Sequence, residues 1–359
     1  MSEHITITDI TLTPVVVPLG RPMRTASGTL PGAALGLIDV TTSSGVSGQA
    51  YIFTYTPKML KASLALNNDV RDIFIGEKVC PSMCFTKFQS TFRLLGIQGL
   101  LGMWFSGVEM ALWDVLGKLE GKPVAQLLGG DIRPLRAYDS YGIVDPAEDL
   151  PLVEASLRQG FTGIKIKIGL GDVEDDLKSI AAVRNVIGPD VALMVDYNQS
   201  LDVKGALERA KRISEYDIYW LEEPVPAEDL AGHRTVREAS PIPVQTGENW
   251  WYPSGAVNAI DADCSDYIMP DLMKIGGFTG WKAATELAAT KNLPVSSHAF
   301  VEVSAHALAA TPNAHWHEYL DKARPILVDA YDIEAGNVCA RGPGLGIEWN
   351  VAKVAEYTI

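Results

Sequence analysis

Ionisable side chains recur along the chain at the spacing of strand–helix units. From Lys165 to Glu318, seven such residues follow one another at intervals of 31, 26, 26, 23, 27 and 20 residues, close to the length of one unit of an α/β barrel. In such a barrel the carboxyl ends of the strands form the active-site face, where an unpaired buried charge is costly. The pattern therefore predicts a ring of functional groups around one barrel mouth. Its members are Lys165, Asp196, Glu222, Glu248, Asp271, His298 and Glu318.

Three members of this ring are carboxylates on neighbouring predicted strands, namely Asp196, Glu222 and Glu248. Converging carboxylates repel one another unless a cation lies among them, and oxygen ligands without Cys or His nearby suit Mg²⁺. Zinc would prefer sulfur or nitrogen ligands. Helix-capping or solvated acids are the alternative, but such acids would not recur at barrel spacing. We therefore expect a Mg²⁺ site, with Asn198 facing the same way as Asp196.

Two bases are predicted beside the metal. Lys165 and Lys167 are two residues apart on one strand, so both side chains point to the same side. Adjacent positive charges and a nearby metal lower the pKa of a lysine, so we expect Lys167 to act as a general base and Lys165 to hold a substrate carboxylate. Solvated lysines on an edge strand are the alternative, which the isoleucines between them disfavour. His298 and Asp271 end neighbouring strands, and an Asp–His pair fixes the tautomer and raises the basicity of the imidazole.

This arrangement selects a chemistry. A substrate held at the metal would lie between two bases that address opposite faces of one carbon. Removal of a proton next to a carboxylate gives an enolate dianion, which needs a cation and a hydrogen-bond donor nearby. Glu318, if neutral in a dry site, is the predicted donor. Two bases permit inversion of a stereocentre or, with a leaving hydroxyl, loss of water. A non-catalytic Mg²⁺-binding barrel is the third possibility, and the complete set of acids and bases argues against it.

Short apolar runs alternate with helical segments from about residue 136, which favours a closed parallel barrel. An open doubly wound sheet would usually carry a glycine-rich phosphate-binding turn after an early strand, and no such turn occurs in that setting. The helices are expected between the strands, for example at 173–187, 203–214 and 279–289. The predicted strands are 136–141, 163–168, 192–198, 219–223, 244–248, 267–271, 294–298 and 316–319.

The first part of the chain indicates an α+β domain. Residues 35–40 and 46–52 predict a hairpin, a helix is expected over about 99–119, and the Pro-, Gly- and Ser-containing stretch 21–32 predicts a mobile loop. We expect a capping domain over 1–130 and a barrel domain over 131–329. Residues 330–359 are expected to pack back on the capping domain.

Several longer stretches carry a family resemblance that runs essentially from end to end. The chain resembles the enolase superfamily, in its mandelate racemase subgroup. The matching stretches are IKIKIG (164–169), MVDYNQSLDV (194–203), WLEEP (220–224), VQTGENW (244–250), MPDLMKIGGFTGW (269–281), SSH (296–298) and AATPNAHW (309–316).

This resemblance implies a (β/α)7β barrel, a modified TIM barrel, with an α+β cap. It implies Mg²⁺ bound by the three carboxylates, with Lys167 as base for one enantiomer and His298, supported by Asp271, for the other. Lys165 would neutralise the substrate carboxylate, Glu318 would act as the electrophilic acid, and Asn198 would support a substrate oxygen. The resemblance also implies a lid over 21–32 and an assembly of many subunits.

The predicted pocket wall departs from the subgroup. Met23 and Ser27 stand where the namesake racemase has valines around a phenyl ring, and Tyr141 stands where a histidine is expected. Tyr55 and Ser140 complete the expected wall. We therefore expect a smaller or more polar 2-hydroxy acid than mandelate, or a dehydratase reaction.

Composition limits the partners. Lys and Arg number 30 against 44 Asp and Glu, a net charge of −14, which argues against nucleic acid as a partner. A site for a small carboxylate must therefore carry its own positive charge, and Lys274 is either such a cation or an ordinary loop charge. The sequence shows no signal peptide and no apolar run of membrane-spanning length, so we expect a cytoplasmic protein without membrane partners.

Overall fold

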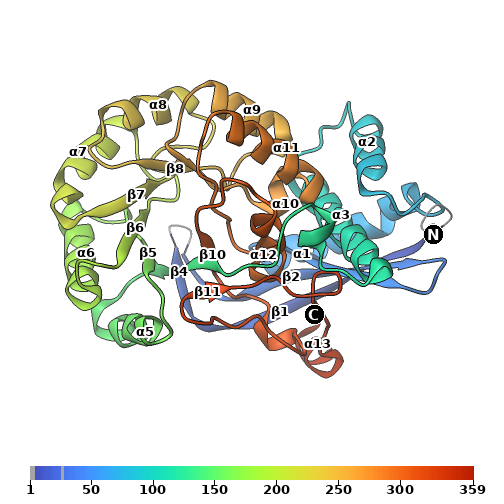
Figure 1. The fold of residues 1–359 in the computed structure, drawn as a ribbon. Helices are drawn as coiled ribbons and strands as arrows, with labels where there is room; N and C mark the ends of the chain where they lie inside the picture. Colours follow the sequence, from blue (N-terminus) through green and yellow to red (C-terminus); the bar gives the residue numbers. More distant parts are fainter. Residues whose placement is uncertain (1–4, 26–27) are drawn as a thin grey trace.

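The computed structural model describes residues 5–25 and 28–359. A curled parallel sheet with helices around its outside forms one part of the molecule, and a three-stranded antiparallel sheet with its own helices lies beside it (Figure 1). Within the described residues, no helix combines the length and the apolar character that crossing a membrane requires.

The parallel strands are hydrogen-bonded in the order β10-β4-β5-β6-β7-β8-β9. Between β9 and β10, Val295 makes single bridges to Ile268 and to Ala314, which closes the ring. The strand predicted at 294–298 is thus present only as these bridges. The strands are β4 (Leu135–Ile143), β5 (Gly163–Lys167), β6 (Ala192–Asp196), β7 (Ile218–Glu222), β8 (Val244–Thr246), β9 (Tyr267–Ile268) and β10 (His317–Tyr319).

The seven strands and the bridged segment at Val295 make eight parallel positions in the barrel. Seven helical connections join them, and in the described residues after β10 no further barrel helix follows. The architecture is therefore the (β/α)7β barrel that the resemblance implied, rather than eight complete strand–helix units. Helices α5 to α9 form an arc around the strands in Figure 1. The connections contain α5 (Pro146–Arg158), α6 (Val173–Ile187), α7 (Val203–Ile213), η3 (Ser214–Tyr216), α8 (Leu230–Ala239), α9 (Tyr252–Asp261), α10 (Leu272–Ile275), α11 (Gly277–Thr290) and α12 (Val301–Ala309).

Alternation along the strands separates the barrel core from the site. In β5, Ile164 and Ile166 point outward and pack against the surrounding helices, so Lys165 and Lys167 point inward. A buried aromatic cluster that includes Tyr138, Trp220 and Trp316 fills part of the barrel interior. Because this interior is closely packed, the charged residues at the strand ends are largely shielded from solvent.

The antiparallel sheet has the order β1-β2-β3. Helix α3 packs along this sheet and ends at Gly121, whose left-handed φ of 65° stops the helix where the sequence predicts. The β2–β3 hairpin confirms the one predicted at 35–52. This part contains β1 (Ile7–Thr25), β2 (Gly28–Thr42), β3 (Ser47–Phe53), α1 (Pro57–Val70), η2 (Arg71–Ile73), α2 (Pro81–Thr91), α3 (Gly99–Glu120) and α4 (Val124–Leu127).

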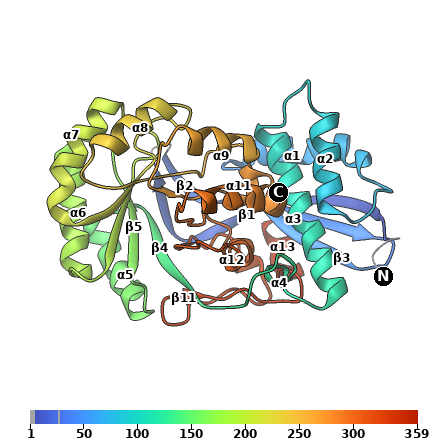
Figure 2. The same ribbon diagram turned by 45° about the horizontal axis from the view of Figure 1, so that its top comes forward.

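The segment predicted as a mobile loop, 21–32, is not a loop in its described part. Met23 pairs with Leu30, and Thr25 pairs with Gly28, so β1 and β2 continue as a long hairpin that reaches the barrel (Figure 2). Antiparallel pairing thus continues through Met23–Thr25 and Gly28–Leu30 in spite of the turn-forming residues of this segment. Residues 26–27, which include the predicted pocket residue Ser27, lie outside the described part of the chain.

Two arginines attach the hairpin to the barrel. Arg21 donates to Asp139 on β4 and its guanidinium lies 3.7 Å from the centre of the Tyr141 ring. Arg24 forms ion pairs with Asp149, at 2.7 Å, and with Glu148 of α5. The hairpin therefore covers one side of the barrel through charged contacts.

The final segment returns to the antiparallel sheet. Trp349 donates from Nε1 to Asp39 of β2 at 3.1 Å, and Thr358 forms a bridge with Val15 of β1. The segment contains η4 (Arg324–Ile326), β11 (Asn337–Val338) and α13 (Val351–Tyr357), and β11 pairs with β4.

A buried histidine connects three parts of this fold. The Nδ1 atom of His306 on α12 accepts a hydrogen bond from the backbone of Ala125, and its Nε2 lies 3.1 Å from the Tyr331 hydroxyl. Burial lowers the pKa of His306 to about 4. The neutral ring is needed because a protonated Nδ1 could not accept the Ala125 hydrogen bond.

Acid should therefore destabilise the protein between about pH 6.5 and pH 4. In that range the unfolded chain binds a proton that folded His306 does not, so its contribution to the free energy of unfolding should fall by about 2 kcal/mol from pH 7 to pH 5. Urea unfolding of His306→Gln, which keeps an acceptor without titrating, should show a correspondingly smaller loss. An equal loss in the variant and the unaltered chain would contradict this assignment.

Candidate active site

Three buried carboxylates meet at the carboxyl ends of β6, β7 and β8. Oxygens of Asp196, Glu222 and Glu248 all lie within 4.8 Å of one another. Asp196 and Glu222 are the last residues of their strands and are paired in register, so their side chains leave the sheet side by side. Gly247 turns the chain after β8 with φ of 139°, and a Cβ there would approach the Met269 backbone to 2.9 Å. This turn brings Glu248 into the group.

The donor set fits a divalent cation that prefers oxygen. Burial raises the pKa of Glu222 to about 8 despite the nearby Lys165 ammonium, because so many negative charges share a dry site. Oxygen donors of three acids, with no Cys or His among them, match Mg²⁺ better than zinc. These three residues would hold the ion.

The two lysines of β5 differ in depth. Lys165 is fully buried and forms ion pairs with Glu222 and, at 2.7 Å, with Glu318. Lys167 reaches Asp196 and keeps 13% of its side chain exposed. Burial acts to lower the pKa of Lys167, but Asp196 outweighs it and the pKa is raised. The lowered pKa expected from the sequence is thus not found, because the Asp196 carboxylate lies beside the Lys167 ammonium.

His298 reaches the carboxylates from the other side of the group. Its Nδ1 lies 2.5 Å from Asp271, which confirms the predicted contact, and its Nε2 lies 3.2 Å from Glu248. Asp271 also accepts hydrogen bonds from the first backbone N–H groups of α10, which fixes its position. Burial opposes a charged imidazole, but Glu248 and Asp271 outweigh it and raise the pKa of His298.

Glu318 lies between Lys165 and His298 at the end of β10. One of its oxygens accepts a hydrogen bond at 2.8 Å from the N–H of Ala299. Burial alone would raise the pKa of Glu318, but Lys165 and His298 lower it well below its usual range. The two cations beside Glu318 thus favour its charged form, and the neutral carboxyl expected from the sequence stays a prediction.

Three further predicted residues lie toward the site, namely Asn198, Ser140 and Tyr55, and a fourth, Tyr141, points away from it. Asn198 holds Asp196 through its backbone N–H at 2.7 Å and its side-chain amide at 3.0 Å. Ser140 is paired in register with Lys165, so both side chains lie on the inner face. Tyr55 lies beside Lys274, whose ammonium is 5.5 Å from the ring centre.

Tyr141 is a correction to the predicted pocket. Its hydroxyl lies 2.6 Å from Ser156 of α5, and its ring packs in the outer cluster with Val153, so it lies on the opposite face of β4 from Ser140. Strand alternation explains this placement, since neighbouring side chains point to opposite faces. Met23 lines a groove between the hairpin and the barrel together with Asp139.

Two family models match this chain. Residues 7–129 match the model described as "Mandelate racemase / muconate lactonizing enzyme, N-terminal domain", and residues 150–354 match "Enolase C-terminal domain-like". The chain belongs to the mandelate racemase / muconate lactonizing enzyme family of the enolase superfamily. It is therefore an enzyme of that superfamily.

Solved and curated relatives agree with this family. An enolase from Bradyrhizobium, crystallised with magnesium and mandelic acid, is 47% identical over 100% of both chains, with a TM-score of 0.97. D-Galactarolactone cycloisomerase of Agrobacterium fabrum is 36% identical over 75% of this chain and 77% of that protein. L-Talarate/galactarate dehydratase of Salmonella typhimurium is 29% identical over 71% of this chain and 65% of that protein. Together with the buried acidic group, the magnesium-bound Bradyrhizobium enolase supports Mg²⁺ as the cofactor of this family member.

Sequence reasoning missed several polar residues near the metal site. Asn249 donates to Glu223 at 2.6 Å and accepts from Lys274, so these three form a polar chain behind Glu248. Glu223 follows Glu222 directly, and Asn249 follows Glu248. If the alternation of side chains along a strand continued, both would point away from the metal site. The positive φ of 37° at Glu223 ends that alternation. Lys322, four residues after Glu318, was also missed.

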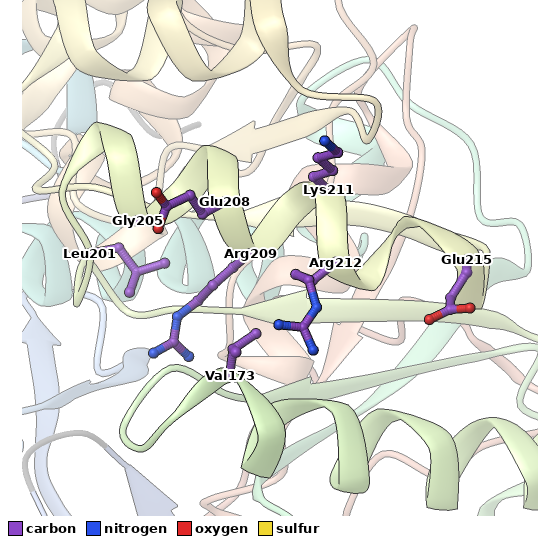
Figure 3. A pocket seen from close by; sticks show the side chains of 8 residues that line it. All are labelled: Val173, Leu201, Gly205, Glu208, Arg209, Lys211, Arg212 and Glu215. Carbon is purple, nitrogen blue, oxygen red and sulfur yellow. The ribbon is translucent and has the colours of Figure 1, made fainter.

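The groove in Figure 3 is not part of this site. It lies on the outside of the barrel, between α6 and α7, and Arg209 and Arg212 point into the space between the helices. Arg209 is paired with Asp176 and Arg212 with Glu174, so both charges are already neutralised. The groove offers no acid or base arranged for catalysis.

Magnesium should stabilise the folded chain through the acidic group. At 100 times the dissociation constant, a ligand that binds only the folded state adds about 2.7 kcal/mol to the free energy of unfolding. Thermal unfolding with MgCl₂ or EDTA should show this gain in the unaltered chain and little of it in Asp196→Asn. Glu286→Gln, on the exposed face of α11, is the control and should keep the gain. Equal gains in all three proteins would contradict the assignment.

Proposed function

We propose that the enzyme abstracts the α-proton of a 2-hydroxycarboxylate and returns a proton to the opposite face, giving racemisation or epimerisation. The observation that carries this proposal is the placement of the two bases. Lys167 contacts Asp196 at one end of the acidic group, and His298 contacts Glu248 at the other end. A substrate held at the group would therefore lie between them.

The substrate carboxylate is bound at the inner end of the site. Lys165 and Ser140 lie on the same inner face, and Lys165 is the deepest cation there. When bound, Mg²⁺ supplies positive charge beside this carboxylate and so lowers the free energy of the enolate dianion. A substrate carboxylate also adds negative charge beside Glu318, which raises its pKa toward the neutral form that can donate a hydrogen bond.

Proton transfer runs between two nitrogen atoms. Neutral Lys167 Nζ takes the α-proton of one enantiomer, and the Nε2–H of protonated His298 delivers a proton to the opposite face. Burial opposes the charged form of Lys167, and a cation bound by Asp196 would weaken the attraction that now raises the pKa of Lys167, as a base requires. The reverse reaction exchanges the two roles, and Asp271 keeps the His298 ring oriented.

Single-base variants should separate the two half-reactions. In D₂O, Lys167→Ala should lower the rate of α-hydrogen exchange of one enantiomer by about 10²–10⁴-fold. His298→Asn should lower the exchange rate of the other enantiomer by a similar factor. Proton NMR of each enantiomer across a 2-hydroxy-acid library measures this exchange. Lys282→Ala, on the exposed face of α11, is the matched control and should leave both rates unchanged. If each variant slows both enantiomers equally, the two-base assignment is wrong.

Loss of water is the second candidate reaction, which the dehydratase among the relatives favours. The same enolate can expel a β-hydroxyl if His298 gives its Nε2 proton to the leaving oxygen. A dehydratase would form a 2-keto acid from a polyhydroxy acid, which a semicarbazide assay detects. We expect no keto acid from 2-hydroxy acids that lack a β-hydroxyl. If no substrate that exchanges gives keto acid, dehydration is excluded.

A further inference from the structure

Lys322 is a buried cation that the proposed mechanism does not use. It follows β10 and only 7% of its surface is exposed. Its ammonium lies 4.9 Å from the centre of the Phe53 ring, at the end of β3. Lys322 therefore reaches from the barrel toward the antiparallel sheet that lies beside it.

The ammonium of Lys322 has no partner of opposite charge. In residues 5–25 and 28–359, no carboxylate oxygen lies within 4.0 Å of its Nζ, and no hydrogen bond joins it to an acceptor. The other lysines of the site are all engaged: Lys165 with Glu318, Lys167 with Asp196 and Lys274 with Asn249. Burial without a close counter-ion lowers the pKa of Lys322 to about 8.

Contacts around Lys322 place it beside the barrel mouth. It follows Glu318 by four residues, and the Phe53 ring near its ammonium lies 4.6 Å from the Tyr55 ring, which lies beside Lys274. Glu318, Asp271 and Glu248 attract the Lys322 ammonium, and Lys167 repels it. These charges belong to the same side of the barrel that the contacts with Phe53 and Tyr55 define. With Phe53 on its other side, the ammonium lies between the ring and the antiparallel sheet.

The nearby carboxylates already have partners of opposite charge. Glu318 is held by Lys165 and by the N–H of Ala299, and Asp271 is held by His298. Glu248 belongs to the metal site. A buried cation in this position is costly unless a ligand supplies the missing negative charge. Contact with the Phe53 ring gives only a weak attraction and leaves the N–H donors available.

We propose that Lys322 binds a second carboxylate of the substrate, so that the enzyme acts on 2-hydroxydicarboxylates. This inference rests on the proposed function, in which the first carboxylate lies at Lys165 and the metal site. A distal carboxylate would satisfy Lys322 through a charge-assisted hydrogen bond in a dry site. A monoacid of the same length would leave this charge buried and unpaired, which discriminates against it.

Matched acids test the inference by calorimetry with Mg²⁺ present. Malate is compared with 2-hydroxybutanoate, and 2-hydroxyglutarate with 2-hydroxypentanoate, because each pair differs in a distal carboxylate at one chain length. Whichever of the two diacids binds more tightly, the unaltered chain should bind it at least about 10-fold more tightly than the monoacid of the same chain length. Lys322→Met should remove this preference while changing monoacid affinity by less than about 3-fold. Lys282→Met is the exposed control and should keep the preference.

The stability of the variant provides a separate check. Because Lys322→Met removes an unpaired buried charge, its melting temperature should equal or exceed that of the unaltered chain. Lys322→Gln, which keeps a polar tip without the charge, should lose the preference in the same way. The inference is overturned if the unaltered chain does not prefer a diacid, or if Lys322→Met weakens both members of a pair equally.

The exchange assay distinguishes this inference from the proposed function. If no acid exchanges its α-hydrogen but calorimetry shows a diacid preference that depends on Lys322, the proposed function fails and the binding role of Lys322 stands. If exchange occurs and Lys322→Met leaves the ratio of diacid to monoacid unchanged, the proposed function stands and the role of Lys322 is overturned.

Discussion

Asp196, Glu222 and Glu248 bring three carboxylates within 4.8 Å of one another in a buried site, and their repulsion must be offset. Isolated buried charges are costly, so the group is stable only with cations around it. Lys165 and Lys167 supply two of these charges, and the Mg²⁺ of this family supplies the rest. The same electrostatic demand explains why bases, acids and metal ligands are gathered at one end of the barrel.

Convergence of these side chains depends on turns as much as on strands. The chain adopts positive φ at Glu223 and at Gly247, and again at Ala299 and Phe300 directly after His298. Such conformations are costly for residues other than glycine and are held in place by the surrounding structure. Here they end the alternation of each strand. The turn after His298 also presents the Ala299 N–H to Glu318.

The antiparallel sheet contributes to the site through its edges. Arg21 attaches the long hairpin to β4, and Phe53 and Tyr55 approach the barrel mouth near Lys322 and Lys274. The proposed catalytic groups come from the barrel, whereas the proposed contact for a substrate's distal end, at Lys322, lies where the barrel meets the antiparallel sheet. Chemistry and specificity are thus carried by different regions of the chain.

Sequence alone determined the barrel and the acidic group, and it placed the proposed bases Lys167 and His298 beside that group, because repeated strand–helix units bring their last residues to one mouth of the barrel. It also determined the Asp271–His298 contact, since neighbouring strands end together. Tertiary structure decided the rest. Pairing placed the described parts of the segment 21–32 in strands β1 and β2, and turns brought Glu223 and Asn249 toward the metal site. Only three-dimensional packing could show that Lys322 is buried without a counter-ion, because solvation and charge depend on neighbours that are distant in the sequence.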